Sequence, residues 1–148
     1  MDTARLQAIA NNLTNITGYG IKICVEDSSK IDAYLHPAGH IVITTGLMNF
    51  FEDDAEMAFI IGHELSHMVS KHYKSGSEIL GISTDIYFPD SLRQEMEADE
   101  YSLKIMKAAG YDPAASLRVL AKIRVNAAGQ LSSYLEKRIN ALAFADGN

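Results

Sequence analysis

The chain has 148 residues, of which 47% are hydrophobic and 22% charged, and this composition is typical of one globular domain with its own core. The formal net charge is −6 and no block of basic residues occurs, so nucleic acid is not an expected partner. Cys24 is the one cysteine, which excludes an internal disulfide. We therefore expect residues 1–148 to form a single catalytic or binding domain.

Two observations bear on membranes and location. No apolar run approaches the roughly 18 residues that a membrane-spanning helix needs. The first ten residues include the acidic Asp2 and lack the basic start and apolar centre of a secretory signal. The sequence thus predicts a soluble protein, cytoplasmic as written, or periplasmic if a signal or anchor has been removed. Nothing in it indicates an oligomeric state.

The first third of the chain predicts one helix and a small sheet. Apolar residues recur at intervals of three and four from Thr3 to about Asn15, which is typical of an amphipathic helix. The β-branched run Gly20–Val25 predicts a strand. Two further extended runs, Ile31–His36 and His40–Thr45, are separated by a Pro-Ala-Gly turn and predict a hairpin.

The rest of the chain is predominantly helical in pattern. A long stretch from Glu52 to Lys74 is apolar on most sides in its middle and predicts a buried helix. The other predicted elements are a surface loop over Ser75–Asp90 and helices over Ser91–Ala109, over residues 112–127 and from Ser132 or Ser133 to Leu142. Early strands followed by helices indicate the α+β class.

The buried helix carries the pattern His-Glu-Leu-Ser-His from His63 to His67. Two histidines four residues apart project from one side of a helix and can chelate one zinc ion, and Glu64 can reach a water molecule bound to that ion. A glutamate inside an apolar helix is costly unless it has a partner, which favours this interpretation. The alternative is that both histidines only satisfy backbone or carboxylate partners.

A catalytic zinc ion usually has three protein ligands, so a third ligand is expected. The stretch after His67 offers only His72, without the glycine that metzincins place before their third histidine. Glu95 and Asp99 stand four residues apart on one face of the next helix. One of the two carboxylates can bind the metal while the other accepts the free ring N–H of a zinc histidine. The alternative for this acidic stretch is a solvated helix face, which we prefer for Glu100.

The motifs together resemble those of a known family, the gluzincin peptidases related to HtpX, the CAAX prenyl endopeptidase and BepA. The resemblance rests on four blocks: residues 39–48 (GHIVITTGLM), 55–67 (AEMAFIIGHELSH), 93–116 (RQEMEADEYSLKIMKAAGYDPAAS) and 136–142 (EKRINAL). The two middle blocks are highly specific in combination. The resemblance implies a zincin-like catalytic domain with a buried active-site helix followed by a glutamate-bearing helix.

This resemblance also implies an activity and a set of roles. The activity is zinc-dependent endopeptidase hydrolysis with one Zn²⁺ per chain, acting on peptides or unfolded proteins in quality control or maturation. The zinc ligands would be His63, His67 and Glu95, the catalytic base Glu64, and the carboxylate that orients a zinc histidine Asp99. Glu64 would take a proton from water and pass it to the leaving amine.

Relatives hold an extended substrate along the sheet-edge strand that precedes the active-site helix. In this chain the resemblance assigns that role to the strand at Gly39–Thr45, in particular to its residues Gly39, His40, Ile41, Val42 and Ile43.

The sequence departs from the family at one point. Relatives usually carry a His-Pro pair six residues before a late arginine. Arg138 matches that arginine, but Ser132 and Ser133 stand where the pair is expected. The transition state or substrate would then be contacted by Arg138, Tyr134 or His40. This departure motivates two alternatives: a weakly active zinc-containing module that binds peptides, and a latent enzyme whose cleft is covered by residues 75–90.

Overall fold

A computed structural model describes residues 1–69, 89–125 and 130–146. Its first element, α1 (Thr3–Thr17), begins at Asp2, whose carboxylate accepts a hydrogen bond from the Arg5 N–H at 2.8 Å. It ends at Gly18, which has a left-handed φ of 78°. Its apolar stripe is buried, as the periodicity predicts.

Three short strands follow: β1 (Ile23–Glu26), β2 (Ala33–Leu35) and β3 (Ile41–Thr44). They form one sheet in the order β1-β3-β2, in which β3 is parallel to β1 and antiparallel to β2. The predicted hairpin is confirmed, and Gly39 adopts a φ of 92° in its turn. The first strand begins three residues later than the sequence predicts.

The central position of β3 corrects the predicted substrate edge. Residues Gly39, His40, Ile41, Val42 and Ile43 lead into and form the middle strand, whose backbone is hydrogen-bonded on both sides. The outer side of β1 is partly occupied, because the Gln7 side chain accepts from the Ile23 N–H and donates to the Ile21 carbonyl, both at 2.9 Å. Among the described residues, β1 and β2 are the two edge strands of the sheet, and the Gln7 contacts lie at β1.

The sequence predicts each of the longer helices, but some of them begin or end at other residues than expected. A short helix that the sequence did not predict, α2 (Thr45–Phe50), is capped by the Thr44 hydroxyl. The longer helices are α3 (Asp54–Val69), α4 (Pro89–Ala108), α5 (Ala114–Val125) and α6 (Gln130–Asp146). Helix α6 begins before both serines that were expected to cap it and extends beyond Leu142. Most of the predicted loop, residues 70–74 of the predicted long helix, and His72 lie outside the described residues.

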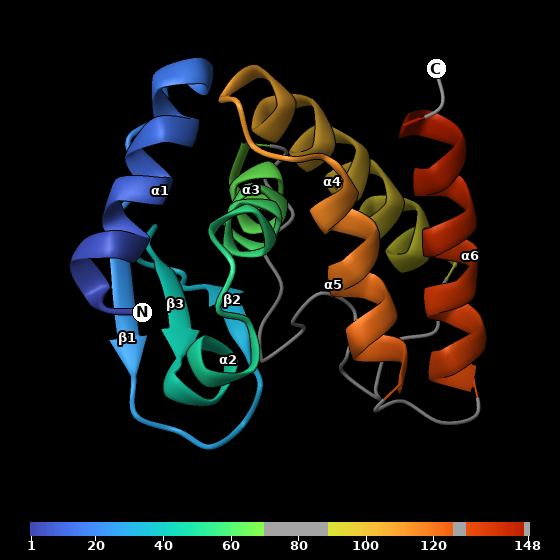
Figure 1. The fold of residues 1–148 in the computed structure, drawn as a ribbon, viewed down its shortest axis with the longest axis horizontal. Helices are drawn as coiled ribbons and strands as arrows, with labels where there is room; N and C mark the ends of the chain where they lie inside the picture. Colours follow the sequence, from blue (N-terminus) through green and yellow to red (C-terminus); the bar gives the residue numbers. More distant parts are fainter. Residues whose placement is uncertain (70–88, 126–129, 147–148) are drawn as a thin grey trace.

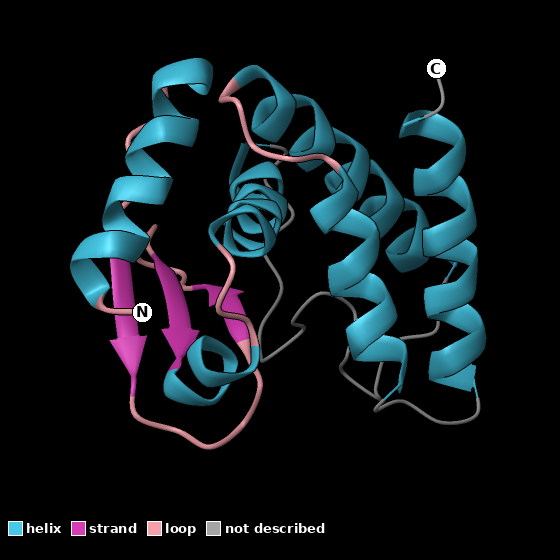
Figure 2. Cartoon of the chain, in the orientation of Figure 1, coloured by secondary structure: helices cyan, strands magenta, loops and turns pink. Residues whose placement is uncertain are grey.

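Figure 1 shows the arrangement that these elements adopt. The sheet and α1 lie on one side of the molecule, α4, α5 and α6 lie on the other, and α3 runs between them. Figure 2 separates the strands from the surrounding helices in the same view. The mixed α+β class is thus confirmed. None of the described helices combines the length and hydrophobicity that a membrane span requires.

Close packing between α3 and α4 depends on Gly62. A Cβ atom at this position would collide with the Ser102 side chain on α4, so only glycine fits at this distance. The Ser102 hydroxyl donates to the Phe59 carbonyl at 2.7 Å and fastens the two helices. As a result, the residue after Gly62 meets the acidic face of α4.

Candidate metal centre

Helix α3 carries the motif into the middle of the protein. The Asp53 carboxylate accepts hydrogen bonds from the Ala55 and Glu56 N–H groups and so supports the start of the helix. Every residue from Ala55 to His67 is buried, and the exposed fractions of His63, Glu64 and His67 are 0%, 3% and 5%. Three ionisable side chains are therefore held in a mainly apolar helix, as the sequence predicts.

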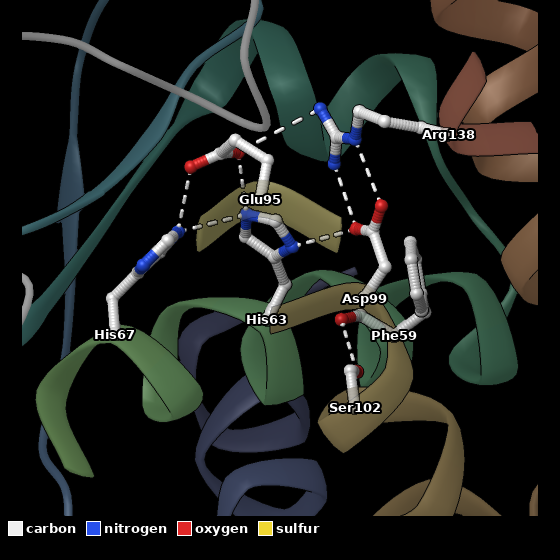
Figure 3. A network of polar contacts seen from close by, with 7 residues as sticks. All are labelled: Phe59, His63, His67, Glu95, Asp99, Ser102 and Arg138. Atoms are coloured by element: carbon white, nitrogen blue, oxygen red, sulfur yellow. Dashed lines mark hydrogen bonds and ion pairs between the residues drawn. The ribbon is translucent and has the colours of Figure 1, made fainter. Parts of the chain in front are cut away.

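Helix α4 brings two carboxylates to these histidines (Figure 3). Glu95 lies 3.0 Å from His63 and 2.9 Å from His67, through one oxygen to each Nε2 atom. The Nε2 atoms of the two histidines are 3.1 Å apart. His63, His67 and Glu95 thus offer two ring nitrogens and a carboxylate at one point, and no other such group of three occurs among the described residues.

These separations fit a zinc ion. Ligand atoms about 2.0–2.1 Å from a tetrahedral zinc ion lie roughly 3.3 Å from one another. The observed spacings of 2.9, 3.0 and 3.1 Å are a few tenths of an ångström shorter, so small side-chain adjustments suffice to admit the ion. Nitrogen and carboxylate ligands are also the types that a catalytic zinc ion uses.

Asp99 orients the first histidine. Its Oδ1 atom lies 2.9 Å from His63 Nδ1, and because an ionised carboxylate only accepts hydrogen bonds, Nδ1 carries the proton. This tautomer leaves Nε2 free to bind a metal ion. The structure therefore separates the two carboxylates that the sequence left interchangeable: Glu95 faces both Nε2 atoms and Asp99 faces Nδ1.

Arg138 enters from α6 and holds Asp99 in place. Its Nε donates to Asp99 Oδ2 at 2.8 Å and its Nη2 donates to Oδ1 at 2.7 Å, a bidentate pair. Its Nη1 also lies 3.6 Å from Glu95. Arg138 is fully buried and its guanidinium lies against these carboxylates, and its predicted contact with substrate stays a prediction.

The charges of this network shift its pKa values strongly. Burial disfavours the charged form of His63, but Glu95 and Asp99 outweigh burial and raise the pKa of His63 to about 10. Burial likewise opposes ionisation of Glu95, yet His63, His67 and Arg138 hold its pKa well below the usual value. The pKa of Asp99 is also lowered, because Arg138 and His63 outweigh the effect of burial.

Glu64 differs from the other two carboxylates. Its Oε1 atom is buried without a hydrogen-bond partner, and burial raises the pKa of the Glu64 carboxyl to about 8. Without a metal ion, then, protons on His63 and Glu64 offset the negative charge of the buried carboxylates. Those two protons together carry the charge of one divalent cation, which would displace them on binding. The donor set therefore fits zinc in charge as well as in spacing.

The remaining sequence candidates lie apart from this cluster or have no ligand role. His40 stacks on His36 at the hairpin turn, with ring centroids 4.4 Å apart. Tyr134 is buried in the core, and Ser132 lies 3.4 Å from Arg124. The predicted roles of His40 and Tyr134 in substrate or transition-state contact stay predictions.

Two acidic residues of α4, Glu97 and Glu100, lie outside the cluster of metal-ligand candidates. Glu97 lies 3.9 Å from Arg93 and Glu100 lies 3.7 Å from Lys104, each one helical turn apart and exposed. These contacts agree with the solvated face that was the alternative for this stretch. Cys24, on β1, is partly exposed.

Sequence reasoning missed the partner of Arg138 and overlooked Asp32. The motif marked Arg138, but its pairing with Asp99 joins residues 39 positions apart and has no local signal. Asp32 stands just before β2, is 5% exposed and has an oxygen atom without a partner. Its acidic character at the start of a strand was the available signal.

Comparison with known proteins identifies the family. The sequence matches the family described as "Peptidase family M48" over residues 2–89, more than half of the chain. The chain belongs to peptidase family M48. The matched range contains His63, Glu64 and His67, whereas Glu95 and Asp99 lie beyond it.

Relatives of this M48 chain extend the similarity further. It is 29% identical to "Mitochondrial metalloendopeptidase OMA1" of Arabidopsis thaliana, over 90% of this chain and 33% of the relative. It is 28% identical to "Metalloprotease LoiP" of Escherichia coli K12, over 89% of this chain and 63% of the relative. The bovine OMA1 is 40% identical over 50 residues. Together with the family, these matches confirm the predicted resemblance, and the relatives carry the names of a metalloendopeptidase and a metalloprotease.

The coverage sets the scope of this comparison. The chain spans about a third of the length of the plant OMA1 and less than two thirds of LoiP. The similarity is therefore to a domain within longer proteins.

Proposed function

We propose that this chain is the catalytic domain of a zinc-dependent endopeptidase in which His63, His67 and Glu95 bind one Zn²⁺ and Glu64 is the general base. The observation that carries this proposal is the convergence of three ligand atoms within 4.8 Å of one another. Two of them come from α3, where a buried glutamate directly follows His63, and the third comes from α4. Family membership supports the same class of reaction.

The residues divide the chemistry between them. A bound zinc ion would polarise the peptide carbonyl and lower the pKa of water. Glu64 accepts the proton of the water molecule that adds to the carbonyl carbon, and it then gives that proton to the leaving amine nitrogen as the C–N bond breaks. Asp99 and Arg138 keep His63 in the tautomer that binds metal.

The peptide would bind along β2 rather than β3. Asp32 and His36 direct backbone hydrogen bonds toward β3, to Thr44 and His40. Because bonding alternates along an antiparallel pair, the backbone groups of Ala33 and Leu35 face outward. An extended peptide can pair with these groups as an added strand. Helix α3 packs beside β2, which brings such a peptide near the metal ligands.

Two variants test the proposal. Glu64→Gln should lower peptide hydrolysis by about 1,000-fold or more while zinc stays bound at about one ion per chain. Glu95→Ala should lose zinc as measured by elemental mass spectrometry. Turnover that survives in Glu64→Gln, or unchanged zinc affinity in Glu95→Ala, would contradict the assignment. The exposed Glu97→Ala is the matched control on the same helix and should behave as the wild type.

The alternative function is a zinc-containing module that binds peptides but cuts them weakly or is latent. Zinc and peptide binding without hydrolysis would support that alternative over the peptidase. Activity that appears only after limited proteolysis would indicate latency. By analogy with the longer relatives, we also propose peptides or unfolded proteins as substrates, in protein quality control or maturation.

A further inference from the structure

Asp32 carries a buried carboxyl group that the proposed mechanism does not use. The residue is 5% exposed, and its Oδ1 atom has no hydrogen-bond partner. Only two other buried side-chain atoms within the described ranges share this property. One belongs to the proposed base Glu64, and the other, in Asp54, forms an ion pair with Arg5. A buried acceptor without a partner is costly, so its retention points to a ligand.

The backbone of Asp32 is fixed. Its N–H donates to the Thr44 hydroxyl at 3.0 Å, and its carbonyl accepts from the Thr44 N–H at 3.0 Å. Thr44 also caps α2 through the Leu47 N–H. The backbone at this position is therefore held by β3 and by the start of α2. It stands at the first residue before β2, the strand along which the peptide would lie.

The charges around Asp32 favour a cation as the ligand. Glu26 adds negative charge, and the exposed Lys30 offsets it only in part. The negative charge of Asp32 also reaches Glu64, which places the two carboxyls in one electrostatic environment. Burial, followed by the effect of Glu26, raises the pKa of Asp32 to about 7, so the residues that the structure describes do not give this carboxylate a sufficient counter-ion.

We propose that Asp32 is a specificity-determining residue that binds the cationic side chain of a lysine or arginine in the substrate, close to the bond that is cut. This inference rests on the proposed peptidase function. A neutral donor would satisfy the hydrogen bond but leave the carboxylate charge uncompensated beside two other acids. A lysine or arginine satisfies both, and a charge-assisted hydrogen bond to a carboxylate is among the stronger polar contacts.

The test separates binding from cleavage. Zinc-loaded Glu64→Gln protein is titrated with fluorescent peptides in which lysine is compared with norleucine at each position around the cleaved bond. We expect lysine at one position to bind about tenfold more tightly than norleucine, because hydrogen bonds to charged groups are worth this order of magnitude. The added Asp32→Asn substitution should reduce that ratio to about one. The wild type should show the same preference in kcat/KM.

A matched control removes a nearby charge without removing the buried site. Glu26→Gln, at an exposed position of the same sheet, should keep most of the lysine preference. An equal loss in both variants would overturn the inference, because the preference would then come from the general negative field. Circular dichroism and zinc content establish that each variant is folded and loaded.

The outcomes distinguish this inference from the proposed function. Hydrolysis without a lysine preference, or a preference that Asp32→Asn retains, overturns the inference and leaves the peptidase function standing. Lysine-dependent binding that needs Asp32, in a wild type that cuts no peptide, supports the inference and contradicts the peptidase function. Absence of both binding and cleavage overturns both.

Discussion

Helix α3 takes part in a buried carboxylate cluster near each of its ends, and the two clusters are neutralised in different ways. Near its start, Glu56 is 2% exposed and accepts hydrogen bonds from Lys122 at 2.7 and 2.9 Å, with Arg118 at 3.5 Å. Both cations keep more than 40% of their side chains exposed. Near its end, the metal centre places Glu95 and Asp99 against Arg138, which is fully buried.

The difference separates a structural cluster from a functional one. At Glu56 the charges are compensated by cations that reach water, so no further partner is required. At the metal centre the compensation is internal and incomplete, since His63 and Glu64 must take up protons when no metal is bound. Burial of charge beyond what the described residues neutralise is therefore the sign of a ligand site, and it sets apart the two carboxylate clusters that helix α3 contacts.

The largest expected effect comes from removing the internal cation. Arg138→Met leaves Asp99 buried without its bidentate partner, and breaking a buried pair in this way costs about 3–5 kcal/mol in the free energy of unfolding. Zinc affinity should fall as well, because His63 loses its fixed orientation. Urea unfolding and a competitive zinc titration measure the two effects. A loss below about 1 kcal/mol in the free energy of unfolding would show that the Arg138–Asp99 pair contributes little to the stability of the folded protein.

Removal of the metal ion tests how much a bound cation, in addition to Arg138, stabilises the buried carboxylates. A ligand present at about 1,000 times its dissociation constant stabilises the folded state by about 4 kcal/mol, so chelation of zinc should lower the stability of the wild type by this amount. Glu95→Ala is the control and should respond little to the chelator. An equal response in both proteins would mean that the chelator acts elsewhere. No change in the wild type would argue against a bound ion.

The same comparison explains what the sequence could predict. Helix α1, the hairpin and the His-Glu-x-x-His helix were predictable because each depends on local periodicity, turn residues or fixed spacing. Glu95 was predictable because the metal needs a third ligand and a spacing of four places Glu95 and Asp99 on one face. The spacing alone did not tell which of the two carboxylates faces the Nε2 atoms, since that depends on how α3 and α4 pack at Gly62, and only the family resemblance assigned that position to Glu95.

Other features depend on pairing across long stretches of chain. The middle position of β3 follows from its parallel pairing with β1, which an extended run of apolar residues does not reveal. The start of α6 was predicted too late because two serines resemble a cap, yet the helix already begins at Gln130. Arg138 was recognised as a candidate, but its partner Asp99 became visible only when α6 was placed beside α4.

The buried carboxyl of Asp32 extends the comparison to a third site. There, the described cation Lys30 only partly offsets the negative charge. The unfolded chain releases this proton near pH 3.8, whereas the folded chain keeps it until about pH 7. Between these values the folded state binds more protons, so its stability falls as the pH rises and levels off above pH 7. Relative to Asp32→Asn, the wild type should lose about 2–4 kcal/mol between pH 4 and pH 8, since one pKa unit corresponds to about 1.4 kcal/mol.

Urea unfolding of both proteins at several pH values measures this difference. Glu26→Gln is the control, because it removes a negative charge near the Asp32 carboxyl without changing Asp32 itself. Lys30, the nearby cation, stays unchanged in every variant. Parallel pH profiles for wild type and Asp32→Asn would contradict the burial of an unpartnered acid. They would also remove the electrostatic basis for a cationic substrate residue.

The smallest effect is expected at the start of α3. Lys122→Met removes two hydrogen bonds to Glu56 and a cation that lies 5.5 Å from the centre of the Phe51 ring. Arg118 remains beside Glu56, and the lost cation is partly exposed, so we expect a loss of about 1 kcal/mol or less in the free energy of unfolding. Zinc affinity should stay unchanged. A loss as large as that of Arg138→Met would mean that both clusters depend equally on their cations, and partial exposure of the cation would then no longer separate a structural cluster from a ligand site.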